Sequence, residues 1–211
     1  MHYCIGPSSN NDIYGLMFVV EFGTEYTKVL HLLNLTTQSN TENIGTIDIY
    51  GVFMPSGCGS SLIGLFSGII KTDSASAISS VSFSNLGEST NFGDLIYAKY
   101  YIVASCSSST RFLNIGGQAN NVELDTISYS NIATSGSMND FGNLSEPKIC
   151  SSTSSKTRSV IETIVSSSGS NTLIEYVEMA TTGNSSNFGN MTNSSGWGCN
   201  SATSNCHGGL S

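Results

Sequence analysis

The chain has 211 residues, of which 38% are hydrophobic and only 10% charged, with a net charge of −8. This length is enough to bury a core as one domain, and an aromatic share of 9% argues against a disordered chain. Lys and Arg total seven residues and form no cluster, which excludes nucleic acid and an anionic membrane surface as partners.

The predicted elements are β-strands along the whole chain. Residues 29–35 (VLHLLNL) are interpreted as a strand, with His31 as a core histidine. Residues 94–105 are rich in Tyr, Ile and Val and predict another strand. Residues 111–117 (RFLNIGG) follow as a further strand that ends at a Gly-Gly bend. Residues 122–132 (VELDTISYSNI) alternate apolar and polar side chains, as a half-buried strand does. No segment carries a sustained helical period.

The segment TLIEYVEMA, residues 172–180, matches VELDTISYS and predicts an equivalent strand near the C-terminal end. It contains Glu175 and Glu178, which lie three residues apart. On a strand this spacing puts the two side chains on opposite faces. We therefore interpret both as surface charges rather than as a catalytic pair.

A repeat of about 48 residues is the strongest signal in the sequence. Phe-Gly pairs recur at spacings of 49 and 47, and Ile44-Gly45 lies 48 residues before the first pair. The repeat positions are Phe92, Gly93, Phe141, Gly142, Phe188 and Gly189, with Gly116 and Gly117 as a Gly-Gly pair that returns at Gly208-Gly209. An Arg recurs at Arg111 and Arg158, with Gly64 and Gly15 at that position in the earlier copies. We expect one repeat domain with copies at about 1–50, 51–98, 99–145 and 146–193 and a partial copy at 194–211.

Cysteines follow the same period, and Cys4 starts the earliest copy. The others in this position are Cys58, Cys106, Cys150 and Cys199. Equivalent positions in stacked repeats are too far apart for a disulfide, so we expect free, packed thiols. Cys199 and Cys206 are the exception, because a bridge across a turn is possible there.

No catalytic, metal or cofactor site is predicted. A GxSxG motif and a CxxC pair are absent, and His2, His31 and His207 lack ligand spacing for zinc or copper. The expected protein is therefore not an enzyme.

Three to four short strands in each copy predict a propeller blade, in which the Phe of each Phe-Gly pair fills the space between blades. The following Gly lets a neighbouring strand pass closely. We expect an all-β fold, a small β-propeller-like array of about four to five blades. An open array, or one completed by another subunit, is the alternative.

Residues 85–190 resemble kelch-like repeats, in the form found in predicted structural proteins of marine bacteriophages. The resemblance is carried by an Ala-Thr-Thr-Gly-Asn turn, Asn-Phe-Gly-Asp-Leu, Cys-Ser-Ser-Ser-Thr-Arg and Gly-Gly. It covers nearly the whole chain, and the first copy departs from it most. It implies a virion structural or appendage protein, such as a tail fibre or decoration protein.

Such a viral protein would present polar loops for assembly or for host attachment through glycans. Its partners would be other virion proteins, a second copy of itself or a host-surface glycan. Tyr100 and Trp197 are candidates for stacking on sugars, whereas Tyr97 and Tyr101 are interpreted as packing residues.

Two alternatives remain open. One is an intracellular kelch-type interaction module, and the other is a secreted glycoprotein. The second would use the Asn-x-Ser/Thr triplets at Asn34, Asn143, Asn184, Asn190 and Asn193. The sequence begins without a secretory signal and contains no transmembrane segment, so we expect a virion or outward-facing location reached by assembly.

Overall fold

The computed structural model describes residues 8–11, 13–22, 26–47, 56–67, 76–99, 104–166 and 172–193. Strands and their connections make up these residues, with no helix among them. The predicted all-β class is confirmed. In particular, none of the described segments forms an apolar helix of membrane-spanning length.

The strands form four antiparallel sheets of four strands each, and in each sheet the strands pair in chain order. The first sheet contains β1 (Ser8–Asn10), β2 (Tyr14–Phe22), β3 (Tyr26–Asn34) and β4 (Glu42–Thr46). The second contains β5 (Ser56–Gly59), β6 (Ile63–Ser67), β7 (Ala77–Ser82) and β8 (Thr90–Asp94). Each sheet lies inside the bounds of one sequence copy.

The third sheet contains β9 (Ala104–Ser107), β10 (Arg111–Ile115), β13 (Thr126–Asn131) and β14 (Asn139–Asn143). A small hairpin, β11 (Gln118–Ala119) with β12 (Val122–Glu123), is inserted between its second and third strands. The fourth sheet contains β15 (Lys148–Ser154), β16 (Arg158–Ser166), β17 (Leu173–Glu178) and β18 (Ser186–Asn190).

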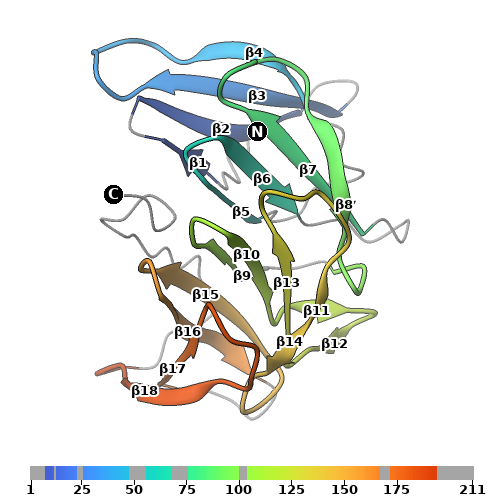
Figure 1. The fold of residues 1–211 in the computed structure, drawn as a ribbon, viewed down its shortest axis with the longest axis vertical. Helices are drawn as coiled ribbons and strands as arrows, with labels where there is room; N and C mark the ends of the chain where they lie inside the picture. Colours follow the sequence, from blue (N-terminus) through green and yellow to red (C-terminus); the bar gives the residue numbers. More distant parts are fainter. Residues whose placement is uncertain are drawn as a thin grey trace.

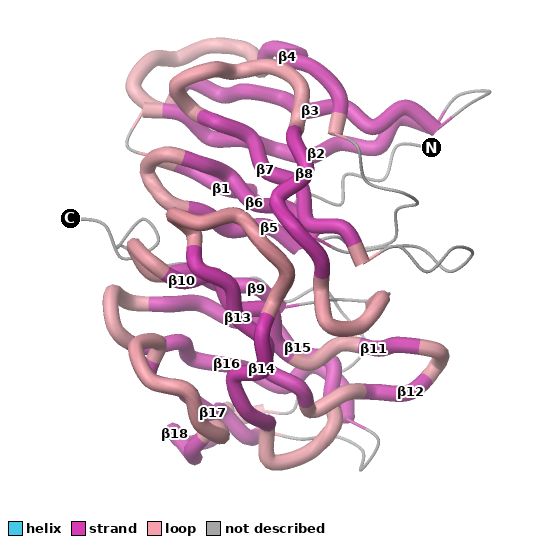
Figure 2. Tube along the Cα trace, turned by 45° about the vertical axis from the view of Figure 1, so that its right-hand side comes forward, coloured by secondary structure: helices cyan, strands magenta, loops and turns pink. Residues whose placement is uncertain are grey.

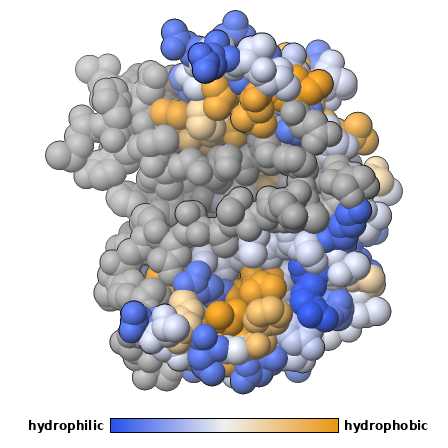
Figure 3. Space-filling view, turned by 90° about the vertical axis from the view of Figure 1, so that its left-hand side faces the viewer, coloured by the Kyte–Doolittle hydropathy of each residue, from blue (hydrophilic) through white to orange (hydrophobic). Residues whose placement is uncertain are grey.

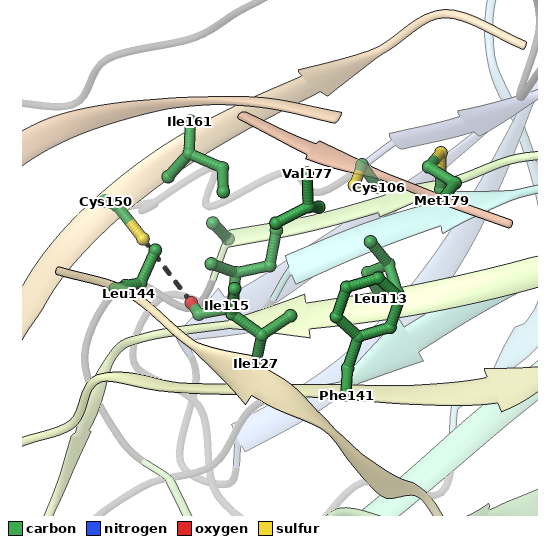
Figure 4. Packing of buried hydrophobic residues seen from close by; sticks show 11 residues of the cluster. Cys106, Leu113, Ile115, Ile127, Phe141, Leu144, Cys150, Ile161, Val177 and Met179 are labelled. Atoms are coloured by element: carbon green, nitrogen blue, oxygen red, sulfur yellow. Dashed lines mark hydrogen bonds between the residues drawn. The ribbon is translucent and has the colours of Figure 1, made fainter. Parts of the chain in front are cut away.

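The four sheets follow one another along the long axis of the molecule, from β1–β4 at one end to β15–β18 at the other (Figures 1 and 2). Their first strands are in contact in succession, β1 with β5, β5 with β9 and β9 with β15. An apolar cluster fills each of the three spaces between consecutive sheets. Figure 4 shows the cluster between the third and fourth sheets, where Phe141 and Leu113 face Val177 and Met179.

A β-bulge recurs at the same point of all four sheets, where the third strand pairs with the fourth. In the third sheet Ile127 pairs with Gly142, but the next residue, Ser128, pairs with Asp140. Phe141 is therefore the extra residue of the bulge, and such a residue points its side chain away from the regular pleat. The equivalent extra residues are Ile44, Phe92 and Phe188. The repeated Phe-Gly pair in the sequence thus marks a bulge.

Two predicted strands differ from the structure. The strand expected over 94–105 is wrong at residues 95–99, which leave the edge strand β8 and lead toward the first strand of the next sheet. Tyr97 in this segment is 47% exposed, so its interpretation as a packing residue is wrong. The strand expected over 122–132 is divided, because the β11–β12 hairpin ends before β13 begins.

The strand register also corrects two repeat positions. Leu113 pairs with Cys106 and Leu65 with Cys58, but the equivalent Val160 pairs with Thr153. Cys150 therefore lies three residues earlier on its strand, which explains its spacing of 44 from Cys106. By the same register, the position of Arg111 is occupied in the first two sheets by Tyr14 and Ile63 rather than by Gly15 and Gly64.

Candidate functional site

Consecutive sheets are joined by one contact that is made three times. The glycine after each bulge lies against the loop that connects the third and fourth strands of the following sheet. A β-carbon built on the bulge glycine would stand 3.0 Å or less from a backbone atom of that loop. The contacting pairs are Gly45 with Gly87, Gly93 with Gly136, and Gly142 with Gly183. We call this arrangement the docking contact.

The docking contact between the third and fourth sheets is also hydrogen-bonded. Gly183 N donates to Phe141 O at 2.8 Å, and Ser185 N donates to Asn143 O at 2.9 Å. Asn143 N in turn donates to the side-chain oxygen of Asn184 at 3.0 Å. The outer edge of β14 is therefore paired with the loop of the next sheet, so that its backbone groups are not left without partners.

An arginine–tyrosine–phenylalanine stack lies beside this contact. The Arg111 guanidinium lies over the Tyr129 ring at 4.7 Å, and that ring meets the Phe141 ring edge-on at 5.9 Å. Arg111 Nη1 donates to Met179 O of the fourth sheet at 2.9 Å. Phe141 is only 3% exposed, so the following sheet covers this stack. The buried position agrees with the expected role of this phenylalanine between sheets.

The fourth sheet carries the same stack without a cover. Arg158 lies 4.4 Å from the centre of the Tyr176 ring, and Tyr176 meets Phe188 edge-on at 6.0 Å. Phe188 is 53% exposed, which contradicts its expected role as a buried plug. The physical reason is that no sheet in the described part of the chain packs against β18. Likewise, no atom lies within 4 Å of a β-carbon built on Gly189.

The uncovered stack is held in place by an exposed ion pair. Glu178 Oε1 accepts hydrogen bonds from Arg158 Nε at 2.9 Å and from Arg158 Nη2 at 2.5 Å. The corresponding residue beside Arg111 is Asn131, which carries no charge. We call the surface formed by Arg158, Tyr176, Phe188 and Gly189 the open edge.

A small open pocket lies where the β17–β18 loop crosses β14. Its volume is about 150 Å³, and its lining includes Phe141, Tyr176, Thr181 and Asn184. Pockets that enclose small organic ligands usually measure about 300–1,000 Å³. We therefore regard it as a packing gap of the docking contact.

A buried lysine pairs with a buried carboxylate inside the fourth sheet, and sequence analysis missed both. Lys148 forms an ion pair with Glu175, and its ammonium also donates to Thr163 Oγ1 at 3.3 Å. Glu175 further accepts from Ser145 N at 3.0 Å and from Ser185 Oγ at 2.5 Å. Burial by itself would raise the pKa of Glu175, but these hydrogen bonds together lower it below its ordinary value.

The interpretation of Glu175 as a surface charge is therefore wrong, whereas Glu178 is exposed as expected. The two do face opposite sides of β17. The error came from taking one face of the strand as solvated, although this face packs against the loop before β15 and the loop that ends at Ser185. The sequence carries no signal of this pair, because Lys148 lies on β15, which is separated from β17 by β16.

A second buried lysine, Lys99, lies between the second and third sheets in the sequence. Its ammonium donates to Asn114 Oδ1 and to Gly116 O, both at 2.8 Å. Gly116 has a φ of +57°, and a β-carbon there would stand 2.7 Å from Lys148 O. Burial lowers the pKa of Lys99 to about 8. The Gly-Gly pair thus lets the backbone approach the start of the fourth sheet.

The described cysteines, Cys58, Cys106 and Cys150, are free thiols. Cys150 Sγ lies 3.5 Å from Ile115 O (Figure 4), and Cys106 Sγ lies 3.0 Å from Ser159 Oγ. Both thiols therefore reach a neighbouring sheet. Burial raises the pKa of Cys106 to about 11 and that of Cys150 to about 12. Such thiols are packing groups rather than nucleophiles at neutral pH.

Other predicted residues are placed only in part. Tyr100, Trp197, Cys199 and the Cys206 partner considered for it lie outside the described residues, as does the Gly208-Gly209 pair. His31 lies on β3, as expected, but it is half-buried and belongs to none of the apolar clusters, so its interpretation as a core histidine is wrong. Its Nδ1 lies 3.2 Å from Thr41 Oγ1, and its buried Nε2 finds no partner among the described residues. Within the described ranges, no three His, Cys, Asp or Glu side chains group so as to hold a metal ion.

Comparison with known proteins bears on the fold alone. No protein-family model matches the chain. No curated protein is similar to it in sequence. Among solved structures, the chain is similar to one described as "Structure of YjhT", with a TM-score of 0.69 and 10% identity. The similarity covers 90% of this chain and 71% of that one.

Proposed function

We propose that the protein is a structural or appendage component, built as an open array of kelch-like, propeller-type sheets that joins a larger assembly through its ends and loops. The observation that carries this proposal is the docking contact, which is made three times among the described residues and is left open by them at β18. A surface that repeats a buried contact, yet is itself exposed, is typical of a site for another protein.

The loops between the third and fourth strands support the same proposal. Residues 36–41, 84–85, 133–135 and 180–184 are exposed and carry mainly hydroxyl and amide side chains. Such side chains both donate and accept hydrogen bonds, which suits contact with protein backbone or with sugar hydroxyls. The resemblance of residues 85–190 to phage structural proteins makes a virion the proposed setting, with an outward-facing location.

The experiment is to find where the native protein resides. Antibodies raised against the recombinant chain are used on virus particles and on soluble extract separated by density gradient from the same infected culture. We expect the protein to sediment with the particles and to remain there after a salt wash. Recovery in the soluble fraction alone would contradict the proposal and favour an intracellular interaction module.

A further inference from the structure

The two ends of the sheet array carry opposite halves of the docking contact. In the second, third and fourth sheets, the loop after the third strand begins with an apolar residue that is buried. These residues are Phe83 at 8% exposed, Ile132 at 8% and Met179 at 1%. The first sheet has Leu35 at this position, as shown by the same backbone hydrogen bond to the loop after the first strand. Leu35 is 47% exposed, because no sheet precedes the first one among the described residues.

The loop that begins at Leu35 matches the loop that docks between the third and fourth sheets. Residues 35–41 read LTTQSNT, and residues 179–185 read MATTGNS. Asn40 corresponds to Asn184, whose side chain accepts the hydrogen bond from Asn143 N. On the open edge, the residue that corresponds to Asn143 is Asn190. The polar and apolar groups needed for a fourth docking contact are therefore present on the two ends.

One difference between these loops is sterically harmless. Ser39 stands where the docked loops have Gly87, Gly136 or Gly183. A β-carbon built on any of these three glycines meets no atom within 4 Å. The glycine that the contact requires is the one after the bulge, and on the open edge that residue is Gly189. Gly87 and Gly136 have φ values of +156° and +158°, which side chains rarely adopt, but Gly183 docks without a positive φ. A loop with serine at this position therefore fits in the conformation of the Gly183 loop.

Geometry decides which copy of the loop reaches the open edge. The first and fourth sheets lie at opposite ends of the long axis in both views (Figures 1 and 2). The side view likewise shows hydrophobic side chains at the surface toward both ends (Figure 3). The 35–41 loop of one chain is thus remote from its own β18. An interface between different surfaces of identical chains joins them head to tail.

We propose that the open edge binds the 35–41 loop of a second copy of this chain, so that copies join head to tail through a fourth docking contact. In this contact Leu35 covers the stack of Arg158, Tyr176 and Phe188 as Met179 covers that of Arg111, Tyr129 and Phe141. Arg158 keeps Nη1 for the carbonyl of the incoming Leu35, because its ion pair with Glu178 uses Nε and Nη2. This inference names the partner for the assembly function proposed above and rests on it.

The test uses two variants that each remove one half of the contact. Light scattering after gel filtration gives the molar mass of the full chain, of Leu35→Asp and of Phe188→Asp. We expect the full chain to form multimers and each variant to associate roughly tenfold or more weakly. Mixing the two variants restores one intact pair of surfaces, so a complex of one copy of each forms and grows no further.

Leu62→Asp is the matched control, because Leu62 is 71% exposed on the second sheet and belongs to neither end. It leaves the association of the full chain unchanged. Circular dichroism and thermal melting check that each variant is folded, and Leu35→Ser and Phe188→Ser replace any variant that is not. A full chain that is monomeric at every soluble concentration overturns the inference, as does a mixture of the two variants that stays monomeric. A monomeric chain that still sediments with particles would leave the proposed function standing.

Discussion

The backbone of Gly183 passes so close to Gly142 that a β-carbon on Gly142 would stand 2.3 Å from the Gly183 carbonyl oxygen. Gly142 has a φ of +149°, which residues other than glycine rarely adopt. Gly189 has the same place in its own sheet and a φ of +157°, but no neighbour within 4 Å of a β-carbon. Comparing Gly142 with Gly189 therefore separates the effect of backbone conformation on stability from the effect of the close approach.

We expect Gly142→Ala to destabilise the fold more than Gly189→Ala. Both substitutions carry the strain of a positive φ, about 1–2 kcal/mol. Gly142→Ala adds the displacement of the Gly183 loop, about 1–3 kcal/mol more. Urea denaturation of both variants and of the unchanged chain measures the difference. Equal losses would show that the close approach does not matter to stability.

A second comparison uses the phenylalanines before these glycines. Phe141→Ala removes a ring that is 3% exposed and should cost about 3–5 kcal/mol of the free energy of unfolding. Phe188→Ala removes a ring that is 53% exposed and should cost about 1 kcal/mol, mostly its contact with Tyr176. Thermal melting of dilute protein, where association between copies is weakest, gives both values. A loss for Phe188→Ala as large as that for Phe141→Ala contradicts the uncovered position of β18.

The repeat made much of this architecture accessible from the sequence. Spacing alone brought Ile44, Phe92, Phe141 and Phe188 to one equivalent position, and the strand register agrees. What spacing does not reveal is whether a sheet follows, so the exposure of Phe188 could not be foreseen. The position of Cys150 on its strand could not be foreseen either. Its spacing of 44 from Cys106, instead of 48, does not say where on the strand the difference arises.

Side-chain burial was harder to predict than strand position. A two-residue period places Glu175 and Glu178 on opposite faces but does not say which faces are solvated. The face of β17 that carries Glu175 packs against loops, so this charge needs a buried partner, whereas Glu178 lies on the uncovered face. Lys148 lies on β15, two strands away from β17 in the same sheet, and nothing in the spacing of 27 residues between the two side chains indicates the pair.

Glu175 and Glu178 allow one substitution to be compared at a buried and at an exposed ion pair on the same strand. Glu175→Gln leaves the charge of Lys148 buried without its partner and should cost about 3–5 kcal/mol. Glu178→Gln breaks the exposed pair with Arg158 and should cost about 0–1 kcal/mol. Chemical denaturation near neutral pH measures both, and similar losses would contradict the buried pair.

The pH dependence of the same variants gives an independent check. The folded pKa of Glu175 is lower than the unfolded value of 4.5, so its stabilising effect is present above that value. It is lost as the pH falls through the folded pKa, because the unfolded state then binds more protons. Melting temperatures measured from neutral to acidic pH should fall less steeply for Glu175→Gln than for Glu178→Gln.

The buried thiols should be inert while the protein is folded. Because burial raises the pKa of Cys106 to about 11 and that of Cys150 to about 12, almost no thiolate forms at pH 8. Iodoacetamide should therefore modify neither residue in native protein and both in urea. Mass spectrometry of the peptides reports each cysteine separately. Modification of Cys106 in native protein would contradict its burial between sheets, and a disulfide at Cys106 would contradict the free thiol.

Lys99 should make stability rise with pH in the alkaline range. Its folded pKa of about 8 lies below the unfolded value of 10.5, so between these values the unfolded state binds the extra proton and the free energy of unfolding increases with pH. The gain over that range is on the order of 3 kcal/mol. The thiols act in the opposite direction, so the useful quantity is the difference between the unchanged chain and Lys99→Met at each pH. The difference in the free energy of unfolding between the two proteins should stay constant below pH 8. From pH 8 to about pH 10 the free energy of unfolding of the unchanged chain should rise relative to that of Lys99→Met. A difference that does not vary with pH would mean that Lys99 is not buried as a charged group beside Asn114 and Gly116.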